Sequence, residues 1–145
     1  MTKPILSICI PTYNRASYLQ ATLDSIVAQP IFQRTSDIEI VISDNCSTDA
    51  TQDVVAVYKK KFPDKLFYHR TEKNIGFDNF REVLSVAHGK FRKLNNDTLV
   101  HRRGSLDMMV NVVKDCERNG EIPFFQTGSS PWPRKVSCAV DVASF

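Results

Sequence analysis

Glycine is scarce in this sequence, with 5 residues in 145, and the glycine-rich loops that bind phosphate groups are missing. The chain has no G-x-x-x-x-G-K-[ST] loop, no G-x-G-x-x-G after its first apolar run and no G-x-S-x-G turn. These absences exclude the usual nucleotide loops of P-loop and dinucleotide-binding proteins, and they exclude the nucleophile turn of α/β-hydrolases.

Long apolar runs and a strong charge of one sign are also missing. No apolar run approaches the ~20 residues that a membrane-spanning helix needs. The start of the chain leads directly into a short apolar stretch rather than a signal peptide. We therefore expect a soluble, cytoplasmic protein that could still contact a membrane surface. The formal net charge of +3 is too small for a dedicated nucleic-acid binder, so we expect no nucleic-acid partner.

Cysteine and histidine are present, but without the spacing of a metal or catalytic site. The four cysteines include no C-x-x-C pair and have no histidine at zinc-ligand spacing, which favours a reduced protein without sulfur-bound metal. The three histidines have no evident carboxylate or serine partner in the sequence, so we predict that none is catalytic. The residues concerned are Cys9, Cys46, Cys116, Cys138, His69, His88 and His101.

Short apolar runs alternate with segments of helical periodicity. Strands are predicted for residues 5–10, 38–43, 66–69 and 91–94, with a candidate fifth at 122–125. Pro11 is expected to end the first strand. Such alternation predicts an α/β fold with a mostly parallel sheet and helices on both of its faces.

The predicted helices have typical start and stop residues. Ser17 is expected to cap the first helix, and Thr48 or Asp49 the second. Gly89 stands in the usual stop position after the third helix. A fourth helix is predicted from residue 105 to residue 120.

Polar side chains follow three of the predicted strands. Because the carboxyl ends of parallel strands meet at one edge of an open α/β sheet, we expect these loops to gather at a ligand-binding edge. Turn and cap chemistry could also explain the second loop taken alone. The loops are Thr12-Tyr13-Asn14-Arg15, Asp44-Asn45 and Asn95-Asn96-Asp97.

Four segments resemble, in order and spacing, those of family 2 glycosyltransferases of the GT-A fold. They are residues 7–15 (SICIPTYNR), 40–51 (IVISDNCSTDAT), 74–79 (NIGFDN) and 87–98 (AHGKFRKLNNDT). Within that family, the chain most resembles O-antigen and surface-polysaccharide transferases of the abequosyltransferase type, which use a CDP-dideoxyhexose. The resemblance implies a Rossmann-like GT-A nucleotide-sugar-binding fold.

The resemblance also implies roles for individual residues. The five residues after the first strand would line the nucleoside pocket, and Asp44 would accept a hydrogen bond from the base. Asn74, Gly76 and Asn79 would shape the pocket wall. The full set of implied donor-binding residues is Pro11, Thr12, Tyr13, Asn14, Arg15, Asp44, Asn45, Asn74, Gly76, Asn79, Asn95 and Asn96.

Asp97 matches the aspartate that usually ligates a divalent metal in such proteins. Mg²⁺ or Mn²⁺, held by one or two carboxylates and by phosphate oxygens, would neutralise the departing diphosphate. Similar proteins carry two or three acidic residues where this chain has Asn96-Asp97-Thr98. We therefore expect weaker metal binding than in a fully acidic site.

By the same resemblance, the reaction is transfer of a sugar, with inversion, from a UDP-, CDP- or GDP-linked donor. The acceptor would be a hydroxyl of a saccharide or lipid-linked oligosaccharide in surface-polysaccharide synthesis. Lipid-linked acceptors raise the expectation of contact with the inner face of the cytoplasmic membrane. A solvated basic rim is the simpler explanation for Arg92, Lys93, Arg102 and Arg103.

No residue after Thr98 matches the catalytic base of the family. We therefore predict a donor-binding domain at 1–126, an acceptor-side beginning or irregular tail at 127–145, and truncation before the acceptor half. The weakened acidic motif and the missing base leave open a nucleotide-sugar-binding module without turnover. A sugar nucleotidyltransferase is less favoured, because it would need a glycine-rich basic loop after the first strand.

Overall fold

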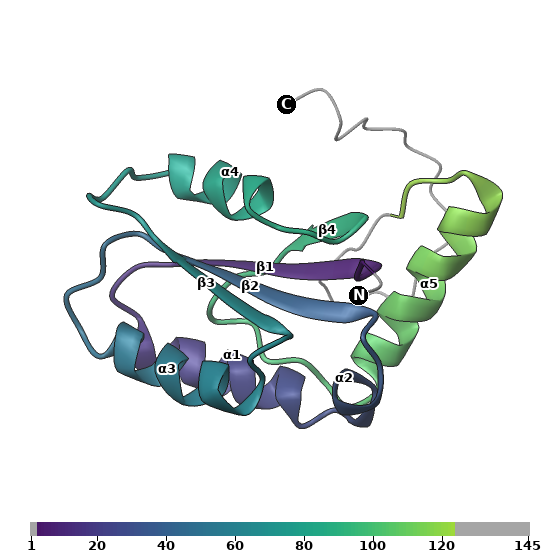
Figure 1. Cartoon of the computed structure of the whole chain (residues 1–145), viewed down its shortest axis with the longest axis horizontal. Coiled ribbons are helices and arrows are strands. Elements are labelled where there is room, and N and C mark those ends of the chain that lie inside the picture. Colours follow the sequence, from purple (N-terminus) through teal and green to yellow (C-terminus); the bar gives the residue numbers. More distant parts are fainter. Residues whose placement is uncertain (1–2, 124–145) are drawn as a thin grey trace.

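The computed structural model describes residues 3–123, which contain a four-stranded parallel sheet flanked by helices (Figure 1). The strands lie in the order β3-β2-β1-β4, and all three pairings are parallel. The predicted α/β fold with a parallel sheet is confirmed. The strands are β1 (Leu6–Thr12), β2 (Ile38–Asp44), β3 (Leu66–Arg70) and β4 (Phe91–Leu94).

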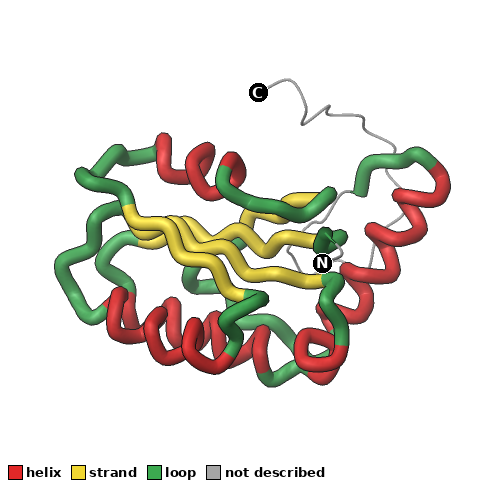
Figure 2. Tube along the Cα trace, in the orientation of Figure 1, coloured by secondary structure: helices red, strands yellow, loops and turns green. Residues whose placement is uncertain are grey.

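Helices cover both faces of the sheet, as predicted (Figure 2). Side chains alternate between the two faces along each strand, so Ile8 and Ile10 enter one core while Cys9 enters the other. The larger core contains side chains of α1, α2, α3 and α5, and the smaller core contains Val83 of α4. None of the helices in residues 3–123 is long and apolar enough to span a membrane. The helices are α1 (Ala16–Val27), α2 (Pro30–Arg34), α3 (Thr51–Lys61), α4 (Asp78–Ser85) and α5 (Ser105–Asn119).

The first strand continues through Pro11 to Thr12, so the prediction that Pro11 ends it is wrong. Pro11 pairs with Ser43 of β2, and the Asn45 N–H donates to the Thr12 carbonyl at 2.9 Å. Because neighbouring residues of a strand point their backbone groups to opposite sides, the Pro11 nitrogen faces the β4 side. The pairing with β4 ends at Cys9, so no ladder hydrogen bond is lost at the proline.

Two predicted helix boundaries also differ from the structure. Helix α1 begins at Ala16, and its first N–H is accepted by the Asp49 carboxylate at 3.0 Å rather than by Ser17. Helix α4 ends well before Gly89. Gly89 is needed for close packing instead, because a Cβ there would lie 2.4 Å from the Ser7 hydroxyl oxygen.

The buried side chain of Glu39, near the start of β2, binds the segment between α4 and β4 through hydrogen bonds. Its carboxylate accepts the backbone N–H groups of His88 at 2.7 Å and Gly89 at 3.0 Å, and the His88 ring lies 3.0 Å away. His69 lies 3.1 Å from Glu82. The sequence shows no evident partner for either histidine, and the fold supplies a carboxylate to each of them. The members of the first pair are 49 residues apart, so no local pattern indicates it.

The predicted fifth strand finds no support in the described residues. Ile122 and Pro123 follow α5 without forming a strand. The rest of that predicted strand, residues 124–125, and the predicted domain boundary after residue 126 lie outside the described residues.

Candidate functional site

The candidate site lies at the carboxyl-terminal edge of the sheet, where the loops after β1, β2 and β3 gather (Figure 2). The strand order reverses between β1 and β4, since the chain passes from β1 outward to β3 and then returns to the other side of β1. Ligands of open α/β sheets bind at such a reversal, outside the carboxyl ends of the strands. Thr12 at the end of β1 and Asp97 after β4 meet there, with the threonine hydroxyl donating to the carboxylate at 2.9 Å.

Asp97 is held in place by three side chains. It is only 5% exposed, and its Oδ2 accepts the Thr12 hydroxyl. Its Oδ1 lies 3.3 Å from Nη1 of Arg15, and its backbone carbonyl accepts the Thr22 hydroxyl of α1 at 2.8 Å. Both carboxylate oxygens therefore already have a partner, and the backbone is fixed to α1.

Asn14 joins the first loop to the second. Its backbone lies in the left-handed region at φ 51°, a conformation that asparagine tolerates better than most residues. Its N–H donates to the Ser47 hydroxyl at 2.9 Å, and its Oδ1 accepts the Thr48 N–H at 2.7 Å. These two contacts fix the loop that presents Tyr13 and Arg15.

Asp44 is fully buried and has several partners of its own. The Ser47 N–H donates to Oδ1 at 2.9 Å, and the Tyr68 hydroxyl donates to Oδ2 at 2.6 Å. Arg70 lies 3.6 Å from Oδ2. Burial and the Asp44 hydrogen bond raise the pKa of Tyr68, so the phenol stays a donor. A nucleoside base could therefore reach this carboxylate only if Tyr68 or Arg70 turned away.

The predicted pocket-wall asparagines connect the second loop to the third. Asn45 donates to the Asn74 side-chain oxygen at 2.9 Å and accepts the Ile75 N–H at 2.7 Å. Asn79 is buried and makes two hydrogen bonds to Ser43 of β2. Asn45 and Asn79 thus hold the third loop in place, whereas Asn74 is exposed.

Asn95 is buried behind the turn that carries Asn96 and Asp97. Its Oδ1 accepts the Lys93 ammonium at 3.0 Å and the His101 Nε2–H at 2.9 Å, while its Nδ2 donates to the Asn96 carbonyl. Burial lowers the pKa of Lys93. Burial, together with the Lys93 charge, lowers the pKa of His101 to about 4. The interpretation of Lys93 as part of a solvated basic rim is wrong, because Lys93 is buried and donates to Asn95. Sequence reasoning also missed His101 as a support of the site, although a lysine inside a short strand was a signal.

The predicted residues fall into two groups by exposure. Those on the surface can touch a ligand, and those beneath it orient the surface residues, except that Asp97 is buried but directs its Oδ1 to the exposed Arg15. The exposed group is Tyr13, Asn14, Arg15, Asn74, Gly76 and Asn96. The buried group is Pro11, Thr12, Asp44, Asn45, Asn79, Asn95 and Asp97.

At this edge, Asp97 is the carboxylate that the family resemblance assigns to a divalent cation, whereas Asp44 is already held by Ser47 and Tyr68. Residues 3–123 contain no group of three or more His, Cys, Asp and Glu side chains that could hold a metal by themselves. Mg²⁺ often binds through one or two carboxylates together with substrate phosphates and water. Asp97 fits the role of that single carboxylate, provided that Arg15 gives up Oδ1.

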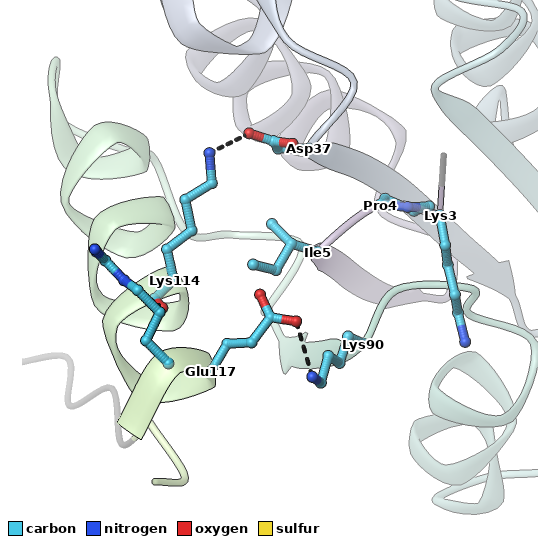
Figure 3. A pocket seen from close by; sticks show the side chains of 8 residues that line it. Lys3, Pro4, Ile5, Asp37, Lys90, Lys114 and Glu117 are labelled. Atoms are coloured by element: carbon cyan, nitrogen blue, oxygen red, sulfur yellow. Dashed lines mark hydrogen bonds and ion pairs between the residues drawn. The ribbon is translucent and has the colours of Figure 1, made fainter. Parts of the chain in front are cut away.

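A cavity of about 610 Å³ lies at the opposite edge, between α5 and the amino ends of the strands. Figure 3 shows two ion pairs across it, Lys114 with Asp37 at 2.5 Å and Lys90 with Glu117 at 2.8 Å. These two pairs neutralise four of the charged lining residues, and Arg118 pairs with Asp115 outside the lining, which leaves Lys3 as the lining cation without an ion pair among the described residues. The cavity is also far from the polar loops at the other edge of the sheet, so we do not regard it as the candidate functional site.

Comparisons with known proteins match the chain to one family. The model of glycosyl transferase family 2 matches residues 7–137. Abequosyltransferase RfbV of Salmonella typhimurium LT2 is 43% identical over 88 residues, which cover 60% of this chain and 26% of that protein.

Two solved structures share the fold. One is the mannosyltransferase PcManGT from Pyrobaculum calidifontis in complex with GDP-Man and Mn²⁺, with a TM-score of 0.65 at 25% identity over 79% of this chain and 33% of that one. The other is S. aureus TarS 1–349 in complex with UDP-GlcNAc, with a TM-score of 0.66 at 25% identity over 77% and 32%. The predicted GT-A fold is confirmed.

The chain spans about a quarter to a third of the length of these relatives. The family match nevertheless covers β1 to α5 and every loop of the candidate site. The chain therefore belongs to glycosyl transferase family 2.

Proposed function

We propose that this chain is the donor-binding part of a glycosyltransferase that moves a sugar from a nucleoside diphosphate sugar to a hydroxyl acceptor. The observation that carries the proposal is the position of Asp97, a buried carboxylate at the strand-order reversal with exposed polar side chains around it. The relatives that share the fold bind GDP-Man and UDP-GlcNAc, which supports the same class of donor here.

The exposed residues at this edge have suitable chemistry for such a donor. Tyr13 is 43% exposed and offers an aromatic ring to a nucleoside. Arg15 offers a guanidinium, the group that best matches phosphate geometry. A Mg²⁺ or Mn²⁺ ion held by Asp97 would supply charge neutralisation to the diphosphate as it departs. Asn96 contributes an exposed amide beside that carboxylate.

The similarity to an abequosyltransferase supports a finer proposal. We infer a donor with a CDP or UDP nucleotide, an acceptor in surface-polysaccharide synthesis of the O-antigen kind, and transfer with inversion. An acceptor attached to a lipid would place the protein at the inner face of the cytoplasmic membrane.

Thermal unfolding of the chain with CDP-, UDP-, GDP- and dTDP-sugars, each with and without Mn²⁺, tests the proposal. We expect one nucleotide class to raise the melting temperature by several degrees, since binding to the folded state alone stabilises it. The increase should be larger with Mn²⁺. Asp97→Ala should lose the Mn²⁺-dependent part, while the control Asp53→Ala, on the exposed face of α3, should keep it.

Two results would count against the proposal. If no nucleotide changes the melting temperature, the donor site is misassigned. If binding survives Asp97→Ala with the same dependence on Mn²⁺, Asp97 is not the metal ligand.

A binding module without turnover is the second candidate. It is favoured by the single carboxylate of the Asn96-Asp97-Thr98 motif and by the lack of a residue after Thr98 that matches the general base of the family. An assay of donor hydrolysis and of transfer to a panel of saccharide acceptors separates the two: a module would bind the donor and leave it intact.

A further inference from the structure

Arg15 and Asp97 form an ion pair at the mouth of the candidate site. The guanidinium Nη1 lies 3.3 Å from Oδ1 of Asp97, and the two side chains differ sharply in exposure, at 55% and 7%. Among the described residues, no other cation is within ion-pair distance of Asp97. Arg15 is therefore the charge that compensates this buried carboxylate.

The two partners also differ in how firmly they are held. Asp97 is fixed through Thr12 and Thr22. The Arg15 side chain makes its one hydrogen bond among the described residues to Asp97, and most of it is in solvent. If the pair opens, Arg15 is the side chain that moves.

Without Arg15, Asp97 would be a buried charge with no opposite charge beside it, which is unfavourable. A divalent cation would remove this penalty, because it would bind the oxygen that Arg15 had left. A metal ion bound at Oδ1 would lie close to the guanidinium on the same oxygen, and the two positive charges would repel each other there. Binding of Arg15 and of a metal ion to Asp97 is therefore antagonistic.

We propose that Arg15 acts as a latch on Asp97. In the donor-free chain, the Arg15 guanidinium neutralises the Asp97 carboxylate. When a divalent cation binds Oδ1, the guanidinium moves to the diphosphate of the donor. The transfer conserves favourable pairing, since the guanidinium exchanges a carboxylate for phosphate oxygens, to which it can bind in a bidentate way. The latch rests on the proposed function, because its second partner is the diphosphate of the donor. It makes metal and nucleotide binding mutually reinforcing.

The latch predicts effects of opposite sign for Arg15→Gln. In the donor-free chain, Mn²⁺ affinity should rise about two- to fivefold, the value of a half-exposed ion pair. Affinity for CDP and UDP should fall about tenfold, because a hydrogen bond from a charged donor to phosphate is lost. Arg15→Lys should restore the competition with Mn²⁺ but only part of the nucleotide affinity.

Electron paramagnetic resonance of free Mn²⁺ and calorimetric titration with CDP and UDP measure the two affinities. Arg34→Gln is the matched control, because Arg34 is exposed near the other end of the sheet and joins no ion pair among the described residues. It should change neither affinity. Thermal unfolding of each variant checks that the fold is intact.

The outcomes separate the latch from the donor site itself. An Mn²⁺ affinity that is unchanged or lower in Arg15→Gln, with nucleotide binding present in the parent chain, would refute the latch alone. Failure of every variant and of the parent chain to bind CDP, UDP or GDP would refute the proposed function, whereas the Mn²⁺ titration would still report whether Arg15 competes for Asp97.

Discussion

His101 is 7% exposed and supports the turn that carries Asn96 and Asp97. Its Nε2 lies 2.9 Å from Asn95 Oδ1, an atom that can only accept, so the ring carries its proton on Nε2. A second proton on Nδ1 would place a charge inside the protein and near the Lys93 ammonium. Burial and that ammonium together lower the pKa of His101 to about 4.

Titration of His101 predicts a loss of stability in mild acid. The pKa of an unfolded histidine is about 6.5, so between pH 6.5 and 4 the unfolded chain binds the extra proton and the folded chain does not. The contribution of neutral His101 to the free energy of unfolding is therefore complete above about pH 6.5 and is lost as the pH falls toward 4. At pH 5 the loss should be about 2 kcal/mol. Urea unfolding at pH 7.5 and pH 5.0 measures it.

His101→Gln is the informative variant, because the glutamine amide can still donate to Asn95 but does not titrate. Its unfolding free energy should change less between the two pH values than that of the parent chain. Gln20→Ala, on the exposed side of α1, is the control and should follow the parent chain. Equal pH dependence in His101→Gln and the parent chain would show that another group is responsible.

At the scale of the elements, Asp49 serves two helices that meet at the candidate site. Its Oδ2 accepts the first N–H of α1 from Ala16 at 3.0 Å, and its Oδ1 accepts the first N–H of α3 from Thr51 at 3.0 Å. Although burial raises the pKa of Asp49, the hydrogen bonds from Thr51 and Ala16 lower it below the ordinary value. One side chain thus sets the starting points of both helices.

Asp49→Ala should destabilise the protein by about 1–2 kcal/mol, the usual value of a helix cap. Asp49→Asn keeps one acceptor oxygen and should lose less. Asp53→Ala removes an acid from the same turn of α3 without removing a cap, and should cost about 0.5 kcal/mol or less. Urea unfolding at pH 7.5 compares the three. A loss in Asp49→Ala no larger than in Asp53→Ala would contradict the double cap.

Local sequence patterns predicted most strands and helices well, but they predicted poorly the contacts at which these elements begin and end. The four strands and the helices α1, α3, α4 and α5 follow from apolar periodicity, which acts within a few residues, whereas the short helix α2 was not predicted. The cap of α1 could not be predicted in this way, because Asp49 lies 33 residues from Ala16 and only the fold brings them together. The same holds for Pro11, whose place in β1 depends on where β4 ends.

At the scale of the molecule, the sheet topology assembles the site. The gathering of the three polar loops could be predicted, since it follows from parallel strands alone. Which of their residues contact a ligand and which support the site could not be predicted. From the sequence, Asn95 resembles a ligand-binding asparagine, but in the structure its Oδ1 accepts hydrogen bonds from Lys93 and His101. Exposure depends on such distant partners, so a motif predicts the location of a site better than it predicts which side chains meet the ligand.

The predicted domain boundary leads to a test on the whole chain. Among the described residues, both core clusters draw their buried members from residues 6–113, and α5 contributes Leu106, Met109, Val110 and Val113. If the predicted boundary after residue 126 is correct, a chain that ends there should unfold in one transition, with a free energy of unfolding within about 0.5 kcal/mol of that of the parent chain. A chain that ends at residue 104 loses these four buried apolar side chains, each contributing about 1.5–3 kcal/mol. Since the total stability of a small domain is only about 5–15 kcal/mol, this shorter chain should be largely unfolded. Urea unfolding followed by circular dichroism compares the three chains, and a chain ending at residue 126 that is as unstable as the one ending at 104 would show that the boundary is misplaced.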